Sequence, residues 1–362
     1  MKIAFYGSSL LSSYWNGAAT YYRGILKELA ARGHQISFYE PDAFDRQQHR
    51  DIDPPSWVRS VVYPATTDAL RAVLAEAADA DVVIKANGVG VFDAELLDGI
   101  IAQSRPGALR IFWDVDAAAT LDEMRGDTSH PVRRALPDLD LVLTYGGGPP
   151  VVHAYEGFGA SACIPVYNAV DLETHHPAAA DPRFACDLAF LGNRLPDREA
   201  RVGEFFLKPA MLLRDRSFLI GGNGWDSAGL PRNVRHAGHI YTAEHNAFNC
   251  TPRAVLNVAR DSMAQVGFSP ATRVFEAAGA GACLITDAWE GIEMFLEPDR
   301  EVLVARDGLD VAAILADLTE QRARAIGTAA LERVRRDHSY ALRGALVDEV
   351  LRTHQARARV PA

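Results

Sequence analysis

The fold of this chain is decided by Phe268-Ser-Pro-Ala-Thr-Arg-Val-Phe-Glu-Ala-Ala-Gly-Ala-Gly-Ala-Cys-Leu-Ile-Thr-Asp287, which predicts a helix followed by a buried strand. Ser269 is suited to cap this helix and Pro270 to stand in its first turn. The free N–H groups and the positive dipole end of such a helix favour an anion, for example a phosphate. Arg273 and Glu276 stand at i and i+3, so they share one face of the helix.

This combination suits a nucleotide, because a cation meets the phosphate and a carboxylate one turn deeper accepts hydrogen bonds from ribose hydroxyls. Gly279 and Gly281 end the predicted helix before the apolar run Ala282–Thr286. The alternative is an ordinary capped helix on which Arg273 and Glu276 pair with each other at the surface.

The composition indicates a globular chain of two domains, because 362 residues exceed the usual size of one hydrophobic core. Hydrophobic residues make up 48% of the chain, yet no apolar run approaches the roughly 20 residues that span a bilayer. The net charge of −10 argues against a nucleic-acid partner, whose phosphates require a basic face.

The start of the chain and its cysteines predict a cytoplasmic protein. A strand begins at Lys2, which leaves no room for a signal peptide. The four cysteines lie far apart in mostly apolar runs, as expected of reduced core residues.

Short apolar runs alternate with helical patterns along the whole chain, which predicts two α/β domains with mostly parallel sheets. The predicted strands of the first half are Ile3–Tyr6, Ile36–Tyr39, Val82–Lys85, Leu109–Trp113, Leu141–Tyr145 and Cys163–Val166. Those of the second half are Leu188–Leu191, Phe218–Gly221, Val234–Ile240, Ala254–Val258, Ala282–Thr286 and Val302–Ala305.

The aperiodic stretch Asn168–Pro182 predicts the connection between the domains. We therefore expect an N-terminal domain over 1–170 and a C-terminal domain over 171–335. From Thr328 onward the pattern is continuously helical. The last part, 336–362, is expected to pack back toward the first domain.

Two doubly wound domains in series are expected to face a central cleft, where ligands bind at the carboxyl ends of the strands. The first loop, Gly7–Gly17, lacks G-x-G-x-x-G and so disfavours a dinucleotide site. Its polar and aromatic residues, together with a later glycine turn, are candidates for the acceptor or cleft side. They are Trp15, Asn16, Gly17, Tyr21, Gly146 and Gly147. Trp225 is a further candidate for stacking on a sugar, although aromatic residues are more often buried.

In the second half, Gly192-Asn193 makes a turn after a predicted strand, and Arg194 and Arg198 follow just before a helix. The planar guanidinium group suits phosphate oxygens, and a strand end places it at the ligand-binding edge. A surface loop with solvated arginines is the alternative.

Taken in order and spacing, the motifs of this chain resemble the CgeB-like, or spore-maturation-protein-like, glycosyltransferases. The resemblance covers nearly the whole chain. In the first half it rests on Trp15-Asn-Gly17, Tyr21-Tyr-Arg23, Arg32-Gly-His34 and Trp113-Asp-Val-Asp-Ala-Ala-Ala-Thr-Leu121. In the second half it rests on Gly192-Asn-Arg194, Gly224-Trp-Asp226, Leu256-Asn-Val-Ala-Arg260, Phe268-Ser-Pro-x-x-Arg-Val-Phe-Glu-Ala277, Glu301-Val-Leu303 and His338-Ser-Tyr-x-x-Arg343.

The resemblance implies a GT-B architecture of two Rossmann-like domains, with a glycosyl transferases group 1 type second domain that binds the nucleotide sugar. Glu276 would then hold the ribose, and Arg194, Arg198 and Arg273 the diphosphate. One departure concerns the first of two glutamates that retaining GT-B enzymes often carry, since Phe268 occupies that position. Contacts to the donor sugar are therefore expected from backbone N–H groups around Phe268–Pro270, Ser269 included, with Asn193 as a further donor-side candidate.

On the acceptor side, Asp114 and Asp116 follow a strand and are expected to point into the cleft. Asp116 could act as a base on an acceptor hydroxyl or bind a sugar hydroxyl. Capping of the next helix is the alternative for each aspartate. A metal role is improbable, because the GT-B class stabilises its leaving diphosphate with cations and helix dipoles.

These observations favour a glycosyltransferase that uses a nucleotide-diphosphate sugar and an unidentified acceptor, with no metal or other cofactor. A sugar-nucleotide epimerase of the same architecture and a two-lobed solute-binding protein are the alternatives. A homo-oligomer is possible.

Overall fold

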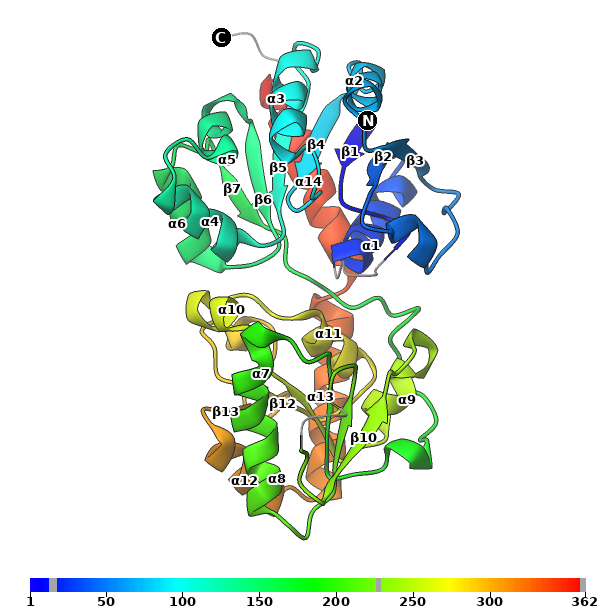
Figure 1. The fold of residues 1–362 in the computed structure, drawn as a ribbon, viewed down its shortest axis with the longest axis vertical. Helices are drawn as coiled ribbons and strands as arrows, with labels where there is room; N and C mark the ends of the chain where they lie inside the picture. The colour runs from blue at the N-terminus through cyan, green and yellow to red at the C-terminus, as the bar shows by residue number, and fades with distance from the viewer. Residues whose placement is uncertain (13–17, 226–228, 359–362) are drawn as a thin grey trace. The chain divides into compact units, whose positions relative to one another are not determined.

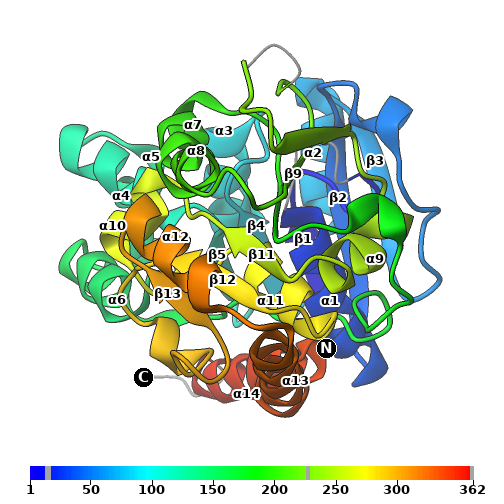
Figure 2. The ribbon, with the colours of Figure 1, turned by 90° about the horizontal axis from the view of Figure 1, so that it is seen from below.

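The computed structural model describes residues 1–12, 18–225 and 229–358, which form two compact units. Unit 1 comprises 1–167 and 340–362, and unit 2 comprises 168–339. Each unit is a parallel sheet with helices on both faces (Figures 1 and 2).

The sheet of unit 1 has seven strands in the order β3-β2-β1-β4-β5-β6-β7. Its strands are β1 (Lys2–Tyr6), β2 (Gln35–Asp42), β3 (Arg59–Pro64), β4 (Val82–Ala86), β5 (Leu109–Asp114), β6 (Leu141–Thr144) and β7 (Cys163–Pro165). Its helices are α1 (Ala18–Ala31), α2 (Thr67–Glu76), α3 (Asp93–Gln103), α4 (Ala117–Gly126), α5 (Pro131–Ala135), α6 (Gly148–Gly157) and α14 (Tyr340–Ala358).

The sheet of unit 2 has six strands in the order β10-β9-β8-β11-β12-β13. Its strands are β8 (Leu188–Leu191), β9 (Phe218–Gly221), β10 (Val234–Gly238), β11 (Ala254–Asn257), β12 (Leu284–Asp287) and β13 (Leu303–Ala305). Its helices are α7 (Pro196–Val202), α8 (Lys208–Leu212), α9 (His245–Cys250), α10 (Asp261–Val266), α11 (Thr272–Gly279), α12 (Gly308–Asp317) and α13 (Glu320–Asp337).

The central strands are buried along almost their whole length, which is why their sequences are apolar runs rather than alternating patterns. All five residues of β4 in unit 1 and all four residues of β11 in unit 2 are buried. The predicted α/β class with two doubly wound sheets is confirmed. One strand was missed: β3 is largely half-exposed, and its apolar run Val61–Tyr63 is only three residues long, between Ser60 and Pro64.

The C-terminal helix α14 packs against α1 within unit 1, and Figure 1 shows the two side by side. Glycines permit the close approach, since a Cβ on Gly24 would lie 2.4 Å from the Tyr340 ring. His34 Nε2 lies 2.7 Å from Asp348 Oδ1, a hydrogen-bonded contact between the residue before β2 and α14. The helix predicted to run unbroken from Thr328 is interrupted, because α13 ends at Asp337 and α14 begins at Tyr340.

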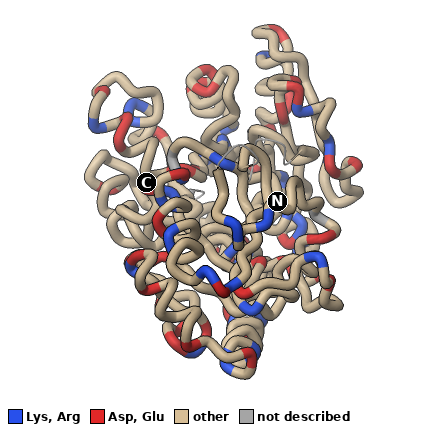
Figure 3. Tube along the Cα trace, turned by 60° about the horizontal axis from the view of Figure 1, so that its bottom comes forward, with Lys and Arg blue, Asp and Glu red and all other residues tan. Residues whose placement is uncertain are grey.

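Charged residues of both signs are interspersed along the two units (Figure 3). Among the described helices, none is long and apolar enough to cross a membrane.

Candidate functional site

Each sheet has one point at which the chain reverses its direction of winding, and ligands of doubly wound folds bind there, outside the carboxyl ends of the strands. In unit 1 this switch point lies between β1 and β4, and in unit 2 between β8 and β11. The two carboxyl edges are described separately.

The turn after β8 in unit 2 is joined to the turn after β9 by a set of short hydrogen bonds. Gly192 N donates to Gly221 O at 2.9 Å, and the Trp225 indole donates to Gly192 O at 2.7 Å. Gly222 has a φ of 114°, and a Cβ there would lie 2.4 Å from Gly192 O, so only glycine fits. Trp225 is 2% exposed, so it packs in the core and cannot stack on a sugar.

Two arginines from different helices converge on the ring of Phe190, at the end of β8. The guanidinium carbon of Arg198 (α7) lies 5.8 Å from the ring centroid, and that of Arg273 (α11) lies 5.4 Å from it. Aromatic faces attract cations, but two like charges gathered at one ring repel each other. The arrangement becomes favourable when an anion neutralises both.

The electrostatics of Arg273 support that interpretation. Burial lowers the pKa of its guanidinium to about 10, with the nearby Arg198 charge as a second cause, while Glu276 raises it. Arg273 remains charged at neutral pH. In the part of the chain that the structure describes, no carboxylate lies within ion-pair distance of this guanidinium. A half-buried cation with no carboxylate at ion-pair distance is costly, so this group is prepared to bind an anion.

Arg194, the third predicted diphosphate ligand, is placed differently. Its Nη2 lies 2.6 Å from Glu199 Oε1, and the hydrogen bond to Glu199 raises the pKa of the guanidinium. Asn193 also has a structural partner, since its Oδ1 accepts a hydrogen bond from Asn223 N at 3.0 Å. The structure thus brings Arg198 and Arg273 together, whereas Arg194 would have to leave Glu199 to reach a phosphate.

Glu276 lies one turn beyond Arg273 on α11, with two histidines beside it. His175 Nε2 lies 3.9 Å from Glu276 Oε1, and Glu276 also interacts electrostatically with His245. Burial lowers the pKa of His245, Glu276 opposes this effect, and Arg273 adds to it. The Glu276 side chain is 27% exposed, so its carboxylate is open to a ligand.

The loop before α11 is strained and tightly held. Phe268 has a φ of 48°, which is unusual for a residue other than glycine. Its N–H donates to Glu290 O at 2.6 Å, and its ring fills the space beside Gly291, where a Cβ would lie 2.2 Å away. The Phe268 N–H is therefore occupied, contrary to the expectation that it faces the donor sugar.

The start of α11 differs from the prediction. The helix begins at Thr272 with Ala271 as its N-cap, so Ser269 does not cap it. Pro270 lies before the helix rather than in its first turn, and the residue preceding a proline is biased away from helical angles. Among the described residues Ser269 has no hydrogen-bond partner, so its hydroxyl and N–H groups stay available next to the first turn of α11.

In unit 1, the two aspartates after β5 have different environments. Asp114 is fully buried, and its carboxylate accepts hydrogen bonds from Asn87 Nδ2 at 2.8 Å, from Asp116 N at 2.9 Å and from the Tyr155 hydroxyl. The expectation that Asp114 points into a cleft is not met, because its oxygens are enclosed by these donors. Asp114 instead fixes the turn that carries Asp116.

Asp116 occupies the N-cap position of α4, but its side chain makes no capping hydrogen bond. The helix-cap alternative thus loses its main support. Asp116 is half-buried at the carboxyl edge of the sheet of unit 1.

The other candidates on the acceptor side are mostly structural. Tyr21 is fully buried, donates to Val166 O at 2.5 Å and accepts from the Trp113 indole at 3.1 Å, so its ring offers no sugar-binding face. Gly147 has a φ of 90°, and a Cβ there would clash with Val151 at 2.1 Å, while Gly146 is buried beside it. These glycines make the turn into α6. Trp15, Asn16 and Gly17 lie outside the described residues.

Three residues of the unit 2 site were not predicted: Phe190, His175 and His245. Phe190 is one apolar residue of a strand, and no sequence signal shows that two arginines meet its ring. His175 and His245 stand 101 and 31 positions before Glu276, and only the fold brings them to α11.

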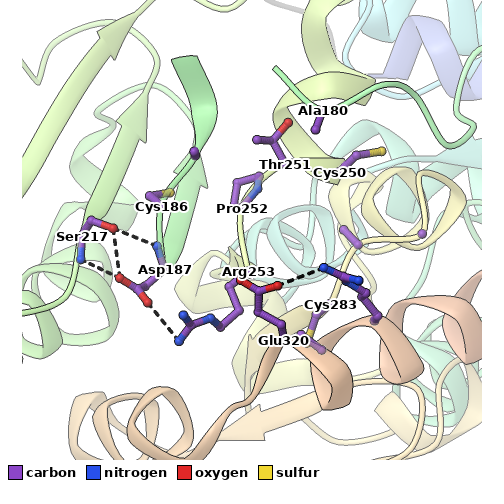
Figure 4. Close-up of a pocket in the computed structure, with 15 residues that line it drawn as sticks. Ala180, Cys186, Asp187, Ser217, Cys250, Thr251, Pro252, Arg253, Cys283 and Glu320 are labelled. Atoms are coloured by element: carbon purple, nitrogen blue, oxygen red, sulfur yellow. Dashed lines mark hydrogen bonds and ion pairs between the residues drawn. The ribbon is translucent and has the colours of Figure 1, made fainter. Parts of the chain in front are cut away.

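A cavity of about 570 Å³ lies away from this edge, near the amino ends of β8, β11 and β12 (Figure 4). Its charges are already paired: Arg253 Nη1 lies 3.0 Å from Asp187 Oδ1, and Arg324 Nη2 lies 2.9 Å from Glu320 Oε2. Burial raises the pKa of the Cys186 and Cys283 thiols to about 12, so these thiols are unreactive at neutral pH. Across the described residues, no group of three or more His, Cys, Asp or Glu side chains is arranged to hold a metal ion.

Comparison with known proteins supports the fold assignment. Residues 198–351 match a protein-family model described as glycosyl transferase-like. No protein among the curated sequences matches the chain significantly.

Solved structures resemble the chain over nearly its whole length. Sucrose-phosphate synthase from Thermosynechococcus elongatus has a TM-score of 0.71 at 14% identity, covering 99% of this chain and 100% of the other. Anabaena HepE in complex with UDP-glucose has a TM-score of 0.66 at 14% identity, with 98% and 100% covered. T4 phage BGT in complex with its UDP-glucose substrate has a TM-score of 0.62 at 11% identity, with 98% and 99% covered. The protein thus has the GT-B fold.

Proposed function

We propose that the protein is a glycosyltransferase that moves a sugar from a nucleoside-diphosphate sugar to an acceptor hydroxyl. The observation that carries this proposal is the convergence of Arg198 and Arg273 on the Phe190 ring, where Arg273 lacks a carboxylate partner. The glycosyl transferase-like match over 198–351 includes both arginines and Glu276. Similar structures bind UDP-glucose, which supports a nucleoside diphosphate as the ligand. The resemblance of the motifs favours the CgeB-like branch.

In this proposal, the guanidinium groups of Arg198 and Arg273 bind the diphosphate, and the carboxylate of Glu276 accepts hydrogen bonds from the ribose hydroxyls. Ser269 and the free N–H groups of the first turn of α11 add donors beside the phosphates. The bond between the sugar carbon and the diphosphate oxygen breaks, and the arginines stabilise the charge that develops on the departing oxygen. No metal or other cofactor enters the step.

On the acceptor side, a hydroxyl oxygen forms the new bond to the sugar carbon, and its proton passes to the Asp116 carboxylate. Asp114 and the hydrogen bond from Asp116 N hold the turn that presents this base. An epimerase of the same architecture would need donor alone and would release a sugar-nucleotide isomer. A two-lobed binding protein would bind without turnover.

The test is isothermal titration calorimetry of the full chain with UDP, GDP, ADP and dTDP, followed by a donor-consumption assay with the sugar nucleotide of the best base. We expect one nucleoside diphosphate to bind, and Arg273→Ala to weaken that binding. Arg324→Ala is the matched control, because Arg324 is exposed on α13 and paired with Glu320 near the opposite ends of the strands (Figure 4). Absence of binding to all four diphosphates would refute the proposal. Isomerisation of the donor without acceptor would favour the epimerase.

A further inference from the structure

We propose that Phe44 is an acceptor subsite that stacks on the apolar face of a sugar ring, so that the acceptor is an uncharged carbohydrate. This inference rests on the proposed function and assigns the class of acceptor. Phe44 lies in the loop after β2 of unit 1, and 57% of its surface is exposed. Such exposure is unusual for a large aromatic side chain that its own loop holds in place.

The backbone that presents this ring is strained. Phe44 has a φ of 56° and Asp45 a φ of 55°, so two consecutive residues other than glycine adopt the left-handed conformation. Such a conformation is unfavourable for a residue with a Cβ and persists only where surrounding contacts enforce it. The strain therefore indicates that the outward ring has a use.

The buried Arg46 side chain packs against the Phe44 ring and supports this conformation. It is only 9% exposed, and its Nη1 donates to Ser8 O at 2.8 Å and to Val89 O at 3.0 Å. Its guanidinium carbon lies 5.0 Å from the centroid of the Phe44 ring. On the same side, a Cβ on Gly90 would lie 2.7 Å from the ring, so the absent side chain makes room for Phe44.

The anchor points place Phe44 at the ligand-binding position of the sheet of unit 1. Ser8 follows β1 and Val89 follows β4, and these two strands flank the switch point. Arg46 bridges both turns, so the ring is fixed beside the crevice where a doubly wound sheet binds its ligand.

The surrounding charges favour an uncharged carbohydrate over an anionic acceptor. Asp93 is linked to the ring's neighbour Gly90, since its Oδ2 accepts a hydrogen bond from Gly90 N at 2.7 Å, but its charge is already paired with Lys85. Asp45 is exposed. A phosphate or nucleic acid would meet the exposed Asp45 carboxylate, while the cation Arg46 is buried and Lys85 is paired with Asp93. A sugar ring has a C–H face for the aromatic ring and peripheral hydroxyls that can donate to carboxylates.

The test uses saturation-transfer difference NMR with a panel of neutral methyl glycopyranosides, with the full chain saturated by the nucleoside diphosphate that it binds. We expect at least one glycoside to bind the parent, Phe44→Ala to weaken it about tenfold, and Phe44→Tyr to keep it. Leu309→Ala is the matched control, because Leu309 is 56% exposed in unit 2 and should have no effect.

Two results would overturn the inference: no glycoside binds the parent, or Phe44→Ala binds it as well as the parent does. Circular dichroism and nucleotide affinity of Phe44→Ala verify that the variant is folded. If a phosphorylated sugar binds and the neutral glycosides do not, the uncharged class is also wrong. Failure of nucleotide binding in the parent would instead refute the proposed function, so the two failures are distinguishable.

Discussion

The carboxyl edges of the two sheets use their charged residues in opposite ways. In unit 1 the buried charges have protein partners: Asp114 accepts from three donors, Glu40 from Leu10 N and Gln47, and Lys85 pairs with Asp93. In unit 2 Arg273 is half-buried without a carboxylate at ion-pair distance, beside Arg198 and an aromatic ring. A satisfied network fixes a surface, whereas an uncompensated cation attracts a ligand of opposite charge.

The hydrogen-bond and ion-pair partners of a charged group therefore indicate its role better than its residue type does. The edge of unit 1 exposes the Phe44 ring and holds the half-buried Asp116, which suits an uncharged acceptor and a base. The edge of unit 2 suits an anionic donor.

Asp116→Asn should reduce sugar transfer by about 10² to 10⁴-fold, because the amide cannot take the proton of the acceptor hydroxyl. Nucleotide affinity should stay unchanged, because Asp116 lies in unit 1 and the proposed diphosphate ligands lie in unit 2. Steady-state rates and calorimetry with the nucleoside diphosphate measure the two quantities. Asp122→Asn is the control on the same helix, where Asp122 pairs with Arg125 at the surface. A variant with the full transfer rate would show that Asp116 takes no part in the mechanism. Loss of the parent's transfer activity on addition of a metal chelator would support the metal alternative.

Arg273→Ala should weaken nucleoside-diphosphate binding by roughly 3 kcal/mol, about a hundredfold, because a bidentate charge-assisted contact is lost. The affinity for the bare nucleoside should change much less, since it carries no phosphate. Arg194→Ala should have a smaller effect than Arg273→Ala, because Arg194 is paired with Glu199. Titrations of both variants with both ligands decide the matter. Equal losses for nucleoside and diphosphate would contradict the assignment of Arg273 to the phosphates.

The sequence predicted the α/β class, because buried parallel strands are apolar runs that any reader can find. It also located the helix of Arg273 and Glu276, whose end is set by Gly279 and the left-handed Gly281. The half-exposed β3 was missed because its apolar run, Val61–Tyr63, is only three residues long. The wrong cap at Ser269 shows that a favoured residue type does not fix where a helix begins.

Side-chain environments were the part that the sequence could not supply. Asp114 and Asp116 are two positions apart and of one type, yet one is enclosed by donors and the other is not a cap. Tyr21 and Trp225 are aromatic like Phe44, but only Phe44 is exposed. These differences arise from contacts between residues far apart in the chain, such as Arg46 with Val89, which no local pattern encodes.

Glu276→Gln should weaken nucleotide binding by about 1 kcal/mol, and Glu276→Ala by about 2 kcal/mol, because the amide keeps neutral hydrogen bonds to the ribose that alanine loses. The 2′-deoxynucleoside diphosphate supplies the matched ligand, since it lacks one of the hydroxyls. The Glu276 substitutions should therefore weaken binding of the deoxynucleotide less than they weaken binding of the ribonucleotide. If the parent binds both nucleotides equally well, Glu276 does not recognise the ribose.

Nucleotide binding should raise the pKa of His245, which is the smallest effect and the most specific to the uncompensated charge of unit 2. Burial lowers the pKa of this imidazole; the Arg273 and His175 charges add to the effect, and Glu276 and the hydrogen bond to Ile240 O oppose it. A diphosphate beside Arg273 would offset the repulsion, so His245 would take up protons on binding, and affinity would rise as the pH falls through its pKa. Proton NMR titration of the His245 ring with and without UDP, assigned by His245→Gln, measures the change.

In Arg273→Ala the pKa of His245 in the free protein should already be higher, and the ligand should raise this pKa less. A pKa that falls or stays constant when UDP binds would show that the diphosphate does not lie beside Arg273, and the contrast between the two edges would then lose its electrostatic basis.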